Sequence, residues 1–168
     1  RCQLHLPLRP GSDAALALAM LHTIVNEKLY DAAFVAQWTS GFADLRVALQ
    51  SYPPEWAAPL TWIAPDLIRQ TARIYAGNRP GILEWGVAFE QNTNSLQTAR
   101  SLAILRALTG NLDVPGGELL GMHWLRTPPV NRGAGVDALI AKRLGADRFR
   151  LLGGKHAHIR MAHAPTLF

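Results

Sequence analysis

The order of apolar patterns along the chain limits its possible folds more than any other feature. Residues 3–8 alternate polar and apolar side chains, which is typical of a short strand, and residues 81–87 form a compact apolar run that indicates a buried strand. The stretches between and after these runs have the spacing of amphipathic helices. This order predicts an α/β fold in which a parallel sheet is covered by helices, as in Rossmann-like domains. Two strands are too few for an independent sheet of this kind.

Helices are expected where apolar residues recur at helical spacing between capping and stopping residues. The first begins at Ser12 or Asp13, either of which can accept a hydrogen bond from a first-turn N–H, and it ends near residues 27–29. Prolines at residues 53 and 54 predict a break after the third helix. The remaining helices are expected at residues 31–37, 42–49, 65–76, 96–108 and 134–144.

Charge divides the chain into two parts. The formal net charge is +5 over 168 residues, of which 49% are hydrophobic, enough to bury a core. Residues 1–122 hold nine Lys and Arg against ten Asp and Glu, whereas residues 123–168 hold eight against two. We predict an α/β domain over residues 1–122 and a loop-rich basic extension over residues 123–168, which either belongs to the same domain or begins the next.

Composition also excludes several classes of protein. The single cysteine, Cys2, allows neither a disulfide framework nor a cysteine-based metal cluster within this chain. The most apolar run, residues 14–25, is interrupted by His22 and is shorter than the ~20 residues of a membrane span, so we expect no direct membrane insertion. No secretory signal is visible, which leaves the compartment open between cytoplasm and periplasm. The chain begins with Arg, and we expect it to be a piece of a longer protein.

The basic extension carries two further candidate sites, neither of which is favoured. His156, His158 and His163 are close in sequence, but Arg160 places a positive charge among them, so no metal-ligating residue is assigned. Aromatic residues are sparse there, which argues against a stacking platform for nucleic acid. The basic residues are better explained as a solvated face or as a surface that packs against an acidic partner.

The turn at residues 10–13 is the first candidate binding site. It joins the first strand-like run to a helix, where free N–H groups favour anions, and Gly11 permits close backbone approach. Ser12 and Asp13 could bind the hydroxyls or the base of a nucleotide. The alternative is an ordinary capped helix, and the spacing matches neither a dinucleotide fingerprint nor a P-loop.

The second candidate is the amide-rich loop at residues 86–95. Ligands of open α/β sheets bind beyond the carboxyl ends of strands, which is where this loop is expected. Gln91, Asn92 and Asn94 offer paired donors and acceptors for heterocycle edges and phosphate oxygens. The alternative is that these are ordinary turn residues. Residues 109–112 and 115–118, which end in Glu118, predict only a helix stop and a flexible turn.

Four pieces of the sequence, taken together, resemble one family. Their order and spacing over residues 3–121 are similar to those of molybdopterin oxidoreductases of the dimethyl-sulfoxide-reductase family, a bacterial and archaeal type of enzyme. The resemblance covers only an internal portion of a longer catalytic subunit. The pieces are His5–His22 with its Pro-Gly-Ser-Asp turn, Leu29–Val35 followed by Thr39–Phe42, Trp85-Gly86 with Gln91 and Asn94, and Leu108–Leu112 with Pro115–Gly117.

The resemblance implies an enzyme that carries two molybdopterin guanine dinucleotides and molybdenum or tungsten. It implies that this chain contacts one cofactor on its guanosine side and on its pterin or pyrophosphate side. Asn94 is implied as a further contact. No catalytic residue and no metal ligand is assigned here, because the family's metal ligand and any iron–sulfur cluster lie upstream. The chain would position the pterin for electron or oxygen-atom transfer and be inactive alone. The guanosine-side residues are Gly11, Ser12 and Asp13, and the pterin- or pyrophosphate-side residues are Gly86 and Gln91.

The same resemblance implies partners. These are the remaining domains of the chain's own catalytic subunit and an iron–sulfur electron-transfer subunit. Two other functions stay open on the sequence alone. One is a small α/β module that binds a nucleotide or phosphorylated metabolite at residues 11–13. The other is an interaction domain whose basic extension docks an acidic surface.

Overall fold

The computed structural model describes residues 2, 4–119 and 142 of the chain. The chain divides into two units, Arg1–Leu120 and Gly121–Phe168. Lys142, an exposed residue in a turn, is the described residue of the second unit. The helix expected at residues 134–144, apart from Lys142, the histidines at residues 156–163 and the rest of the basic extension lie outside the described residues.

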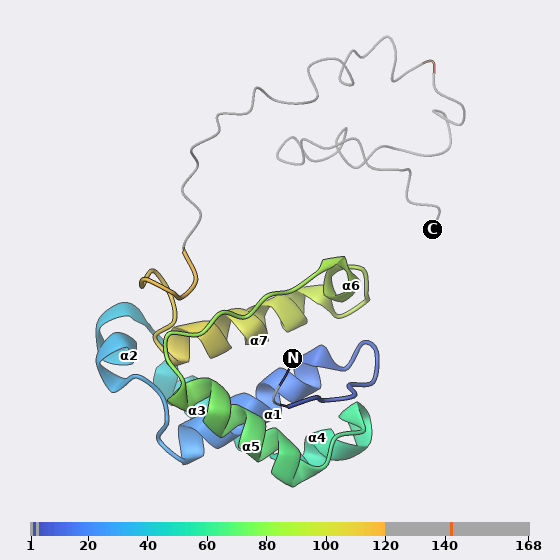
Figure 1. Ribbon diagram of the computed structural model, residues 1–168, viewed down its shortest axis with the longest axis horizontal. Coiled ribbons are helices and arrows are strands. Elements are labelled where there is room, and N and C mark those ends of the chain that lie inside the picture. The colour runs from blue at the N-terminus through green and yellow to red at the C-terminus, as the bar shows by residue number, and fades with distance from the viewer. Residues whose placement is uncertain (1, 3, 120–141, 143–168) are drawn as a thin grey trace. The chain divides into compact units, whose positions relative to one another are not determined.

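The described part of the first unit is built from seven helices (Figure 1). Five of them, α1, α2, α3, α5 and α7, confirm the helices expected before residue 110. Their bounds, with those of the two helices that the patterns do not predict, are α1 (Asp13–Asn26), α2 (Ala32–Trp38), α3 (Phe42–Leu49), α4 (Pro54–Thr61), α5 (Pro65–Gly77), α6 (Val87–Glu90) and α7 (Ser95–Leu108).

Helix α1 is central to the hydrophobic core. Its alanine-rich sequence lets neighbouring helices approach closely, and it packs against α3, α4, α5 and α7. Leu21 and Ile24 are 0% exposed, as is Ile68 of α5 opposite. Helix α2 begins as expected at Asp31, whose Oδ1 accepts a hydrogen bond from the Phe34 N–H at 2.9 Å.

Helix α4 is not predicted by the sequence pattern because prolines surround it. Pro54 stands at the first helical position, where the missing N–H has no intrahelical partner to lose. Pro59 lies inside the helix, which remains short. Trp62 then closes the helix with φ of +64°, and its N–H donates to the Ala58 carbonyl at 2.9 Å.

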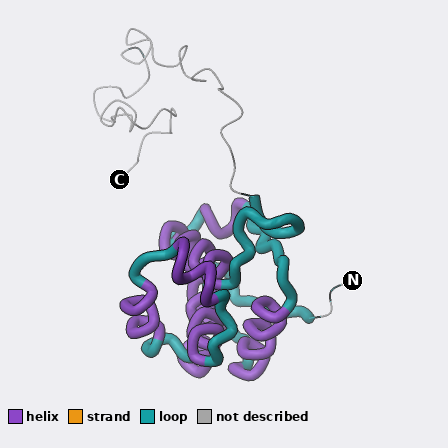
Figure 2. Tube along the Cα trace, turned by 90° about the vertical axis from the view of Figure 1, so that its left-hand side faces the viewer, coloured by secondary structure: helices purple, strands orange, loops and turns teal. Residues whose placement is uncertain are grey.

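Neither strand-like run forms a strand in the described residues, which are helix and loop throughout (Figure 2). In the first run the Leu8 N–H donates to the Leu6 carbonyl at 2.8 Å, forming a tight turn. The second run, Gly81–Gly86, is followed by α6. In this part of the chain the only backbone bridge pairs Leu112 with Glu118. The prediction of a parallel sheet is therefore not confirmed, because a strand needs a neighbouring backbone and the described residues supply none to either run.

Candidate functional site

Gly11 and Ser12 set the turn that leads into α1. Gly11 has φ of +79°, in the left-handed region that favours glycine. Ser12 occupies the N-cap position with φ of −104°, and its hydroxyl donates to the Arg9 carbonyl at 2.6 Å. The expectation that Ser12 or Asp13 caps the helix is wrong, because the Ser12 backbone is not in the extended conformation that aims a side chain at first-turn N–H groups. Within the described part of the chain, the N–H groups of Asp13 and Ala14 have no hydrogen-bond partner.

A cavity of about 440 Å³ with a mixed polar and apolar lining, called here the turn cavity, opens beside this turn. It is lined by Gly11, Ser12 and Arg9, by Trp56 of α4, and by Asn94 at the start of α7. The Arg9 guanidinium also lies 5.5 Å from the ring centre of Trp62. The structure thus brings together three of the six predicted cofactor-binding residues, Gly11, Ser12 and Asn94.

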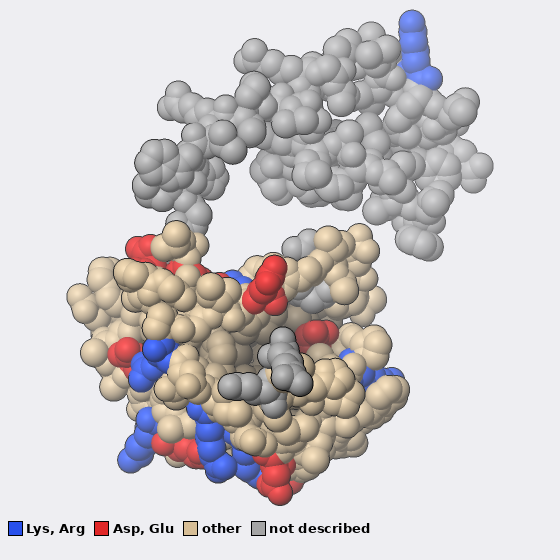
Figure 3. Space-filling view, viewed as in Figure 1, with Lys and Arg blue, Asp and Glu red and all other residues tan. Residues whose placement is uncertain are grey.

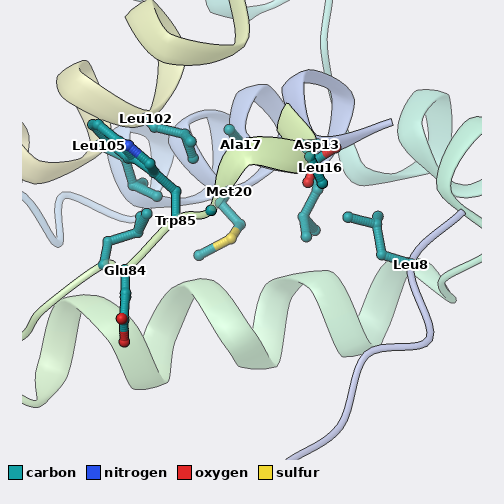
Figure 4. Close-up of a pocket in the computed structure, with 12 residues that line it drawn as sticks. Leu8, Asp13, Leu16, Ala17, Met20, Glu84, Trp85, Leu102 and Leu105 are labelled. Atoms are coloured by element: carbon teal, nitrogen blue, oxygen red, sulfur yellow. The ribbon is translucent and has the colours of Figure 1, made fainter. Parts of the chain in front are cut away.

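A second, mainly apolar hollow of about 360 Å³ lies between the residues before α1, α1 itself, the Gly81–Gly86 segment and α7. It opens on the face shown in Figure 3, and Figure 4 shows Leu8 and Leu16 at one end of it and Trp85 at the other. Asp13 and Gly86 both line this hollow, which brings two more predicted residues together.

The loop that contains Gly86 and Gln91 is open to solvent. Gly86 has an extended backbone, with φ of −121° and ψ of −177°, and no atom lies within 4 Å of the position that a Cβ would take. Gln91 ends α6, is exposed and lines neither cavity. Its N–H donates to the Val87 carbonyl at 3.1 Å, so its side-chain amide is not needed to close the short helix.

Side chains hold one edge of the Gly81–Gly86 segment. The Gly81 N–H donates to Oδ1 of Asn111 at 2.9 Å, and the Leu83 N–H donates to Oε1 of Glu118 at 2.7 Å. Backbone groups of alternate residues point to opposite sides of an extended chain. Ile82 and Glu84 therefore face the other way, and among the described residues their backbone groups have no hydrogen-bond partner.

Arg106 of α7 joins this segment to the helix. Its Nη2 donates to the Leu83 carbonyl at 2.6 Å, and its guanidinium carbon lies 3.6 Å from the ring centre of Trp85. Its Nε lies 2.7 Å from Oε2 of Glu118 but forms no hydrogen bond, so this pair is an ionic contact. Only 13% and 14% of the two side chains are exposed, and breaking a pair at that depth costs about 3–5 kcal/mol.

The turn after α7 has a structural role that its sequence does not predict. Asn111 is 0% exposed, and its Nδ2 donates to Oγ1 of Thr109 at 2.8 Å. That hydroxyl donates in turn to the Leu105 carbonyl at 2.9 Å. Sequence reasoning thus missed Arg106, and it assigned Asn111 and Glu118 only to a helix stop and a flexible turn. The available signal was the polar run Thr109-Gly110-Asn111, since a helix stop requires the glycine alone.

Titratable side chains elsewhere form ion pairs between helices. A hydrogen bond from the Arg73 guanidinium lowers the pKa of Glu27, and Arg69 lowers the pKa of Glu55 in the same way. None of these four residues lines either cavity. Among the described residues, no group of three or more His, Cys, Asp and Glu side chains could hold a metal ion. No helix in that part of the chain combines the length and the apolar character that a membrane crossing requires.

Known proteins are similar to this chain in sequence and in structure, although no protein-family model matches it. The chain is 39% identical over 127 residues to the acetylene hydratase of Syntrophotalea acetylenica, a match that covers 76% of this chain and 17% of that protein. It is 42% identical over 112 residues to formate dehydrogenase H of Escherichia coli (strain K12), covering 67% of this chain and 16% of that protein. The solved structure of acetylene hydratase from Pelobacter acetylenicus matches with a TM-score of 0.63 and 39% identity, over 65% of this chain and 15% of that one.

These matches decide the family. The chain is homologous to the molybdopterin oxidoreductases of the dimethyl-sulfoxide-reductase family. The family resemblance carried by the four sequence pieces is thereby confirmed. The chain spans less than one fifth of the length of the molybdopterin enzymes that it matches, so it corresponds to part of a larger subunit in these relatives.

Proposed function

We propose that this chain binds part of a molybdopterin guanine dinucleotide within a molybdenum or tungsten oxidoreductase. The observation that carries the proposal is the turn cavity at the start of α1. It brings Gly11, Ser12 and Asn94 beside two first-turn N–H groups that are without partners in the described residues. The start of a helix carries partial positive charge, which favours an anionic or strongly polar ligand. Homology to molybdopterin enzymes supports the choice of this cofactor among nucleotides.

Gly11, Ser12 and Asp13 are proposed to contact the guanosine side. Ser12 and Ala14 line the turn cavity while Asp13 between them lines the hollow, so the turn presents groups to both. A carboxylate accepts hydrogen bonds only, which suits guanine because its N1–H and N2–H₂ donors stand side by side, whereas adenine and cytosine each offer one amino group. The residues present therefore fit a guanine nucleotide.

Gly86 and Gln91 are proposed to contact the pterin or pyrophosphate side. The empty space around Gly86 supports this assignment, because a ligand can approach the backbone there. The exposed amide of Gln91 offers both donors and acceptors, and Asn94 offers the same groups from the turn cavity.

The chain's own part in the reaction is to bind and orient the cofactor. When bound, the pterin dithiolenes and their metal supply the electron or oxygen-atom transfer. No catalytic residue or metal ligand is assigned to this chain, and we propose that it is inactive alone. An iron–sulfur cluster upstream and an iron–sulfur subunit as electron partner belong to the same proposal.

The parallel sheet of the predicted α/β fold is proposed to be completed by other domains of the same subunit. Ile82 is 66% exposed, and its backbone faces away from the edge that Asn111 and Glu118 hold. An extended chain with one free edge is a template for strand pairing.

Calorimetric titration of the full chain with GDP and with ADP tests the nucleotide assignment. We expect GDP to bind at least roughly ten-fold more tightly than ADP, since guanine offers two adjacent donors, N1–H and N2–H₂, to one carboxylate, whereas adenine offers a single amino group. Asp13→Ala should remove this preference. The matched control is Asp44→Ala, because Asp44 stands in the first turn of α3 and lines neither cavity. Equal affinity for both nucleotides would favour a general nucleotide-binding module instead.

A further inference from the structure

We propose that Arg106 and Glu118 are positioning residues for the cofactor loop, defined as residues 85–91. The inference rests on the proposed function, because it concerns how this chain presents Gly86 and Gln91 to the pyrophosphate side of the dinucleotide. Neither Arg106 nor Glu118 lines the two cavities. They act through Leu83, three residues before Gly86, and Trp85, which comes immediately before it.

The contacts around Leu83 form a closed ring. The Leu83 N–H donates to Oε1 of Glu118 at 2.7 Å, and the Leu83 carbonyl accepts from Nη2 of Arg106 at 2.6 Å. Glu118 Oε2 and Arg106 Nε, 2.7 Å apart, complete the ring. Both backbone groups of one residue are therefore held by side chains that also hold each other, which fixes the direction in which the chain leaves Leu83.

The same guanidinium orients the next aromatic ring. The Arg106 guanidinium carbon lies 3.6 Å from the centre of the Trp85 ring, at stacking distance. A guanidinium is planar and presents its donors in a fixed fork, so stacking on Trp85 and donation to Leu83 constrain each other. A lysine could keep the charge but not the stacked plane. By holding Leu83 and Trp85, Arg106 thus fixes the backbone that leads to Gly86.

The turn after α7 is built to hold Glu118. The Glu118 N–H donates to the Asn111 carbonyl at 2.8 Å, and the Asp113 N–H donates to the Glu118 carbonyl at 2.6 Å. A Cβ on Gly117 would lie 2.5 Å from the Asn111 carbonyl oxygen, so only glycine fits before Glu118. The cofactor loop has little support of its own, since α6 spans four residues.

Fluorine NMR of the full chain labelled with 5-fluorotryptophan tests the stacking without any ligand. The resonance that disappears in Trp85→Phe identifies Trp85. We expect Arg106→Met and Arg106→Lys to shift this resonance and to raise its sensitivity to exchange of H₂O for D₂O, because one face of the ring is uncovered. The control is Arg100→Met, which removes an exposed arginine from the same helix. An unchanged Trp85 resonance in both Arg106 variants overturns the proposal.

Nucleotide affinities test the positioning itself. GDP carries the pyrophosphate that GMP lacks, so contacts to the second phosphate make GDP bind more tightly, by roughly ten-fold for one charge-assisted hydrogen bond. We expect Arg106→Lys and Glu118→Ala to bring the two affinities together while GMP affinity stays within about two-fold of the wild type. Glu118→Gln should keep most of the difference, because its amide oxygen can still accept from Leu83.

The outcomes separate this inference from the proposed function. If the wild-type chain binds GDP no more tightly than GMP, the pyrophosphate assignment fails and the fluorine spectra decide whether Arg106 positions Trp85. If the wild type prefers GDP and the Arg106 and Glu118 variants keep that preference in full, the positioning role fails while the binding site stands. Far-UV circular dichroism identifies any variant that has lost its helices, and Arg106→Lys, which keeps the charge, then replaces it.

Discussion

The helical body and the cofactor loop of this chain are held together by different interactions. In the helical body, defined as α1, α3, α4 and α5, the side chains of Leu21 and Ile68 are fully buried. In the loop region, Ile82 is 66% exposed and Val87 is 60% exposed. The body is stabilised by apolar burial, which is nondirectional, whereas the loop takes its position from a few directed polar contacts.

The way in which a segment is held decides how many of its groups remain available to a ligand. A segment held by its own apolar packing has few groups left to offer a ligand, because its side chains are committed to the core. The Gly81–Gly86 segment is held along one edge by Asn111, Glu118 and Arg106, so its other edge and the loop beyond it stay available. Both candidate cavities lie where such a segment or turn meets α1 or α7.

The largest difference between the two regions is expected when an apolar side chain is shortened in each. Leu21→Ala should lower the free energy of unfolding by about 2–5 kcal/mol, because it leaves a cavity at a fully buried position of α1. Ile82→Ala should change it by less than about 0.5 kcal/mol, since that side chain is mostly in solvent. Urea denaturation followed by circular dichroism measures both. Similar losses would show that the loop region is part of the same apolar core.

A smaller effect is expected from pH. The hydrogen bond from Arg73 lowers the pKa of Glu27 below its usual value of 4.5, so the folded state binds this proton less readily than the unfolded chain. The resulting stability is present above pH 4.5 and is lost as the pH falls through the lowered pKa. Glu27→Gln should flatten the dependence of the urea midpoint on pH in that window, by much less than the Leu21→Ala loss, because both side chains of the pair are partly exposed. An unchanged pH profile would show that the ion pair between Arg73 and Glu27 does not stabilise the helical body.

Local patterns predicted the helices well and the rest of the fold poorly. Asp31 and Pro65 mark helix starts through interactions within a few residues, so their helices follow from the sequence. Pro59 conceals α4, because a proline inside a helix ordinarily ends it. The two strand-like runs fail as strands because strand pairing depends on residues distant in sequence, and the described part of the chain supplies no partner.

The sequence suggested candidate residues but not how they are arranged in space. Gly11 and Ser12 were found from a turn before a helix, yet nothing in the sequence shows that Asn94 lines the same cavity. The contacts of Asn111 and Glu118 were not predicted because their partners, Gly81 and Leu83, lie far away along the chain. Contacts that position a loop from a distance leave no periodic signal.

The central claim, that the start of α1 binds the guanosine side of the cofactor, is tested most directly by amide hydrogen exchange with and without GDP. We expect the amide hydrogens of residues 11–16 to exchange more slowly when GDP is bound, because the N–H groups of Asp13 and Ala14 gain a partner. Exchange in the buried part of α5 should stay the same. Binding of GDP without any slowing at residues 11–16 would contradict the account.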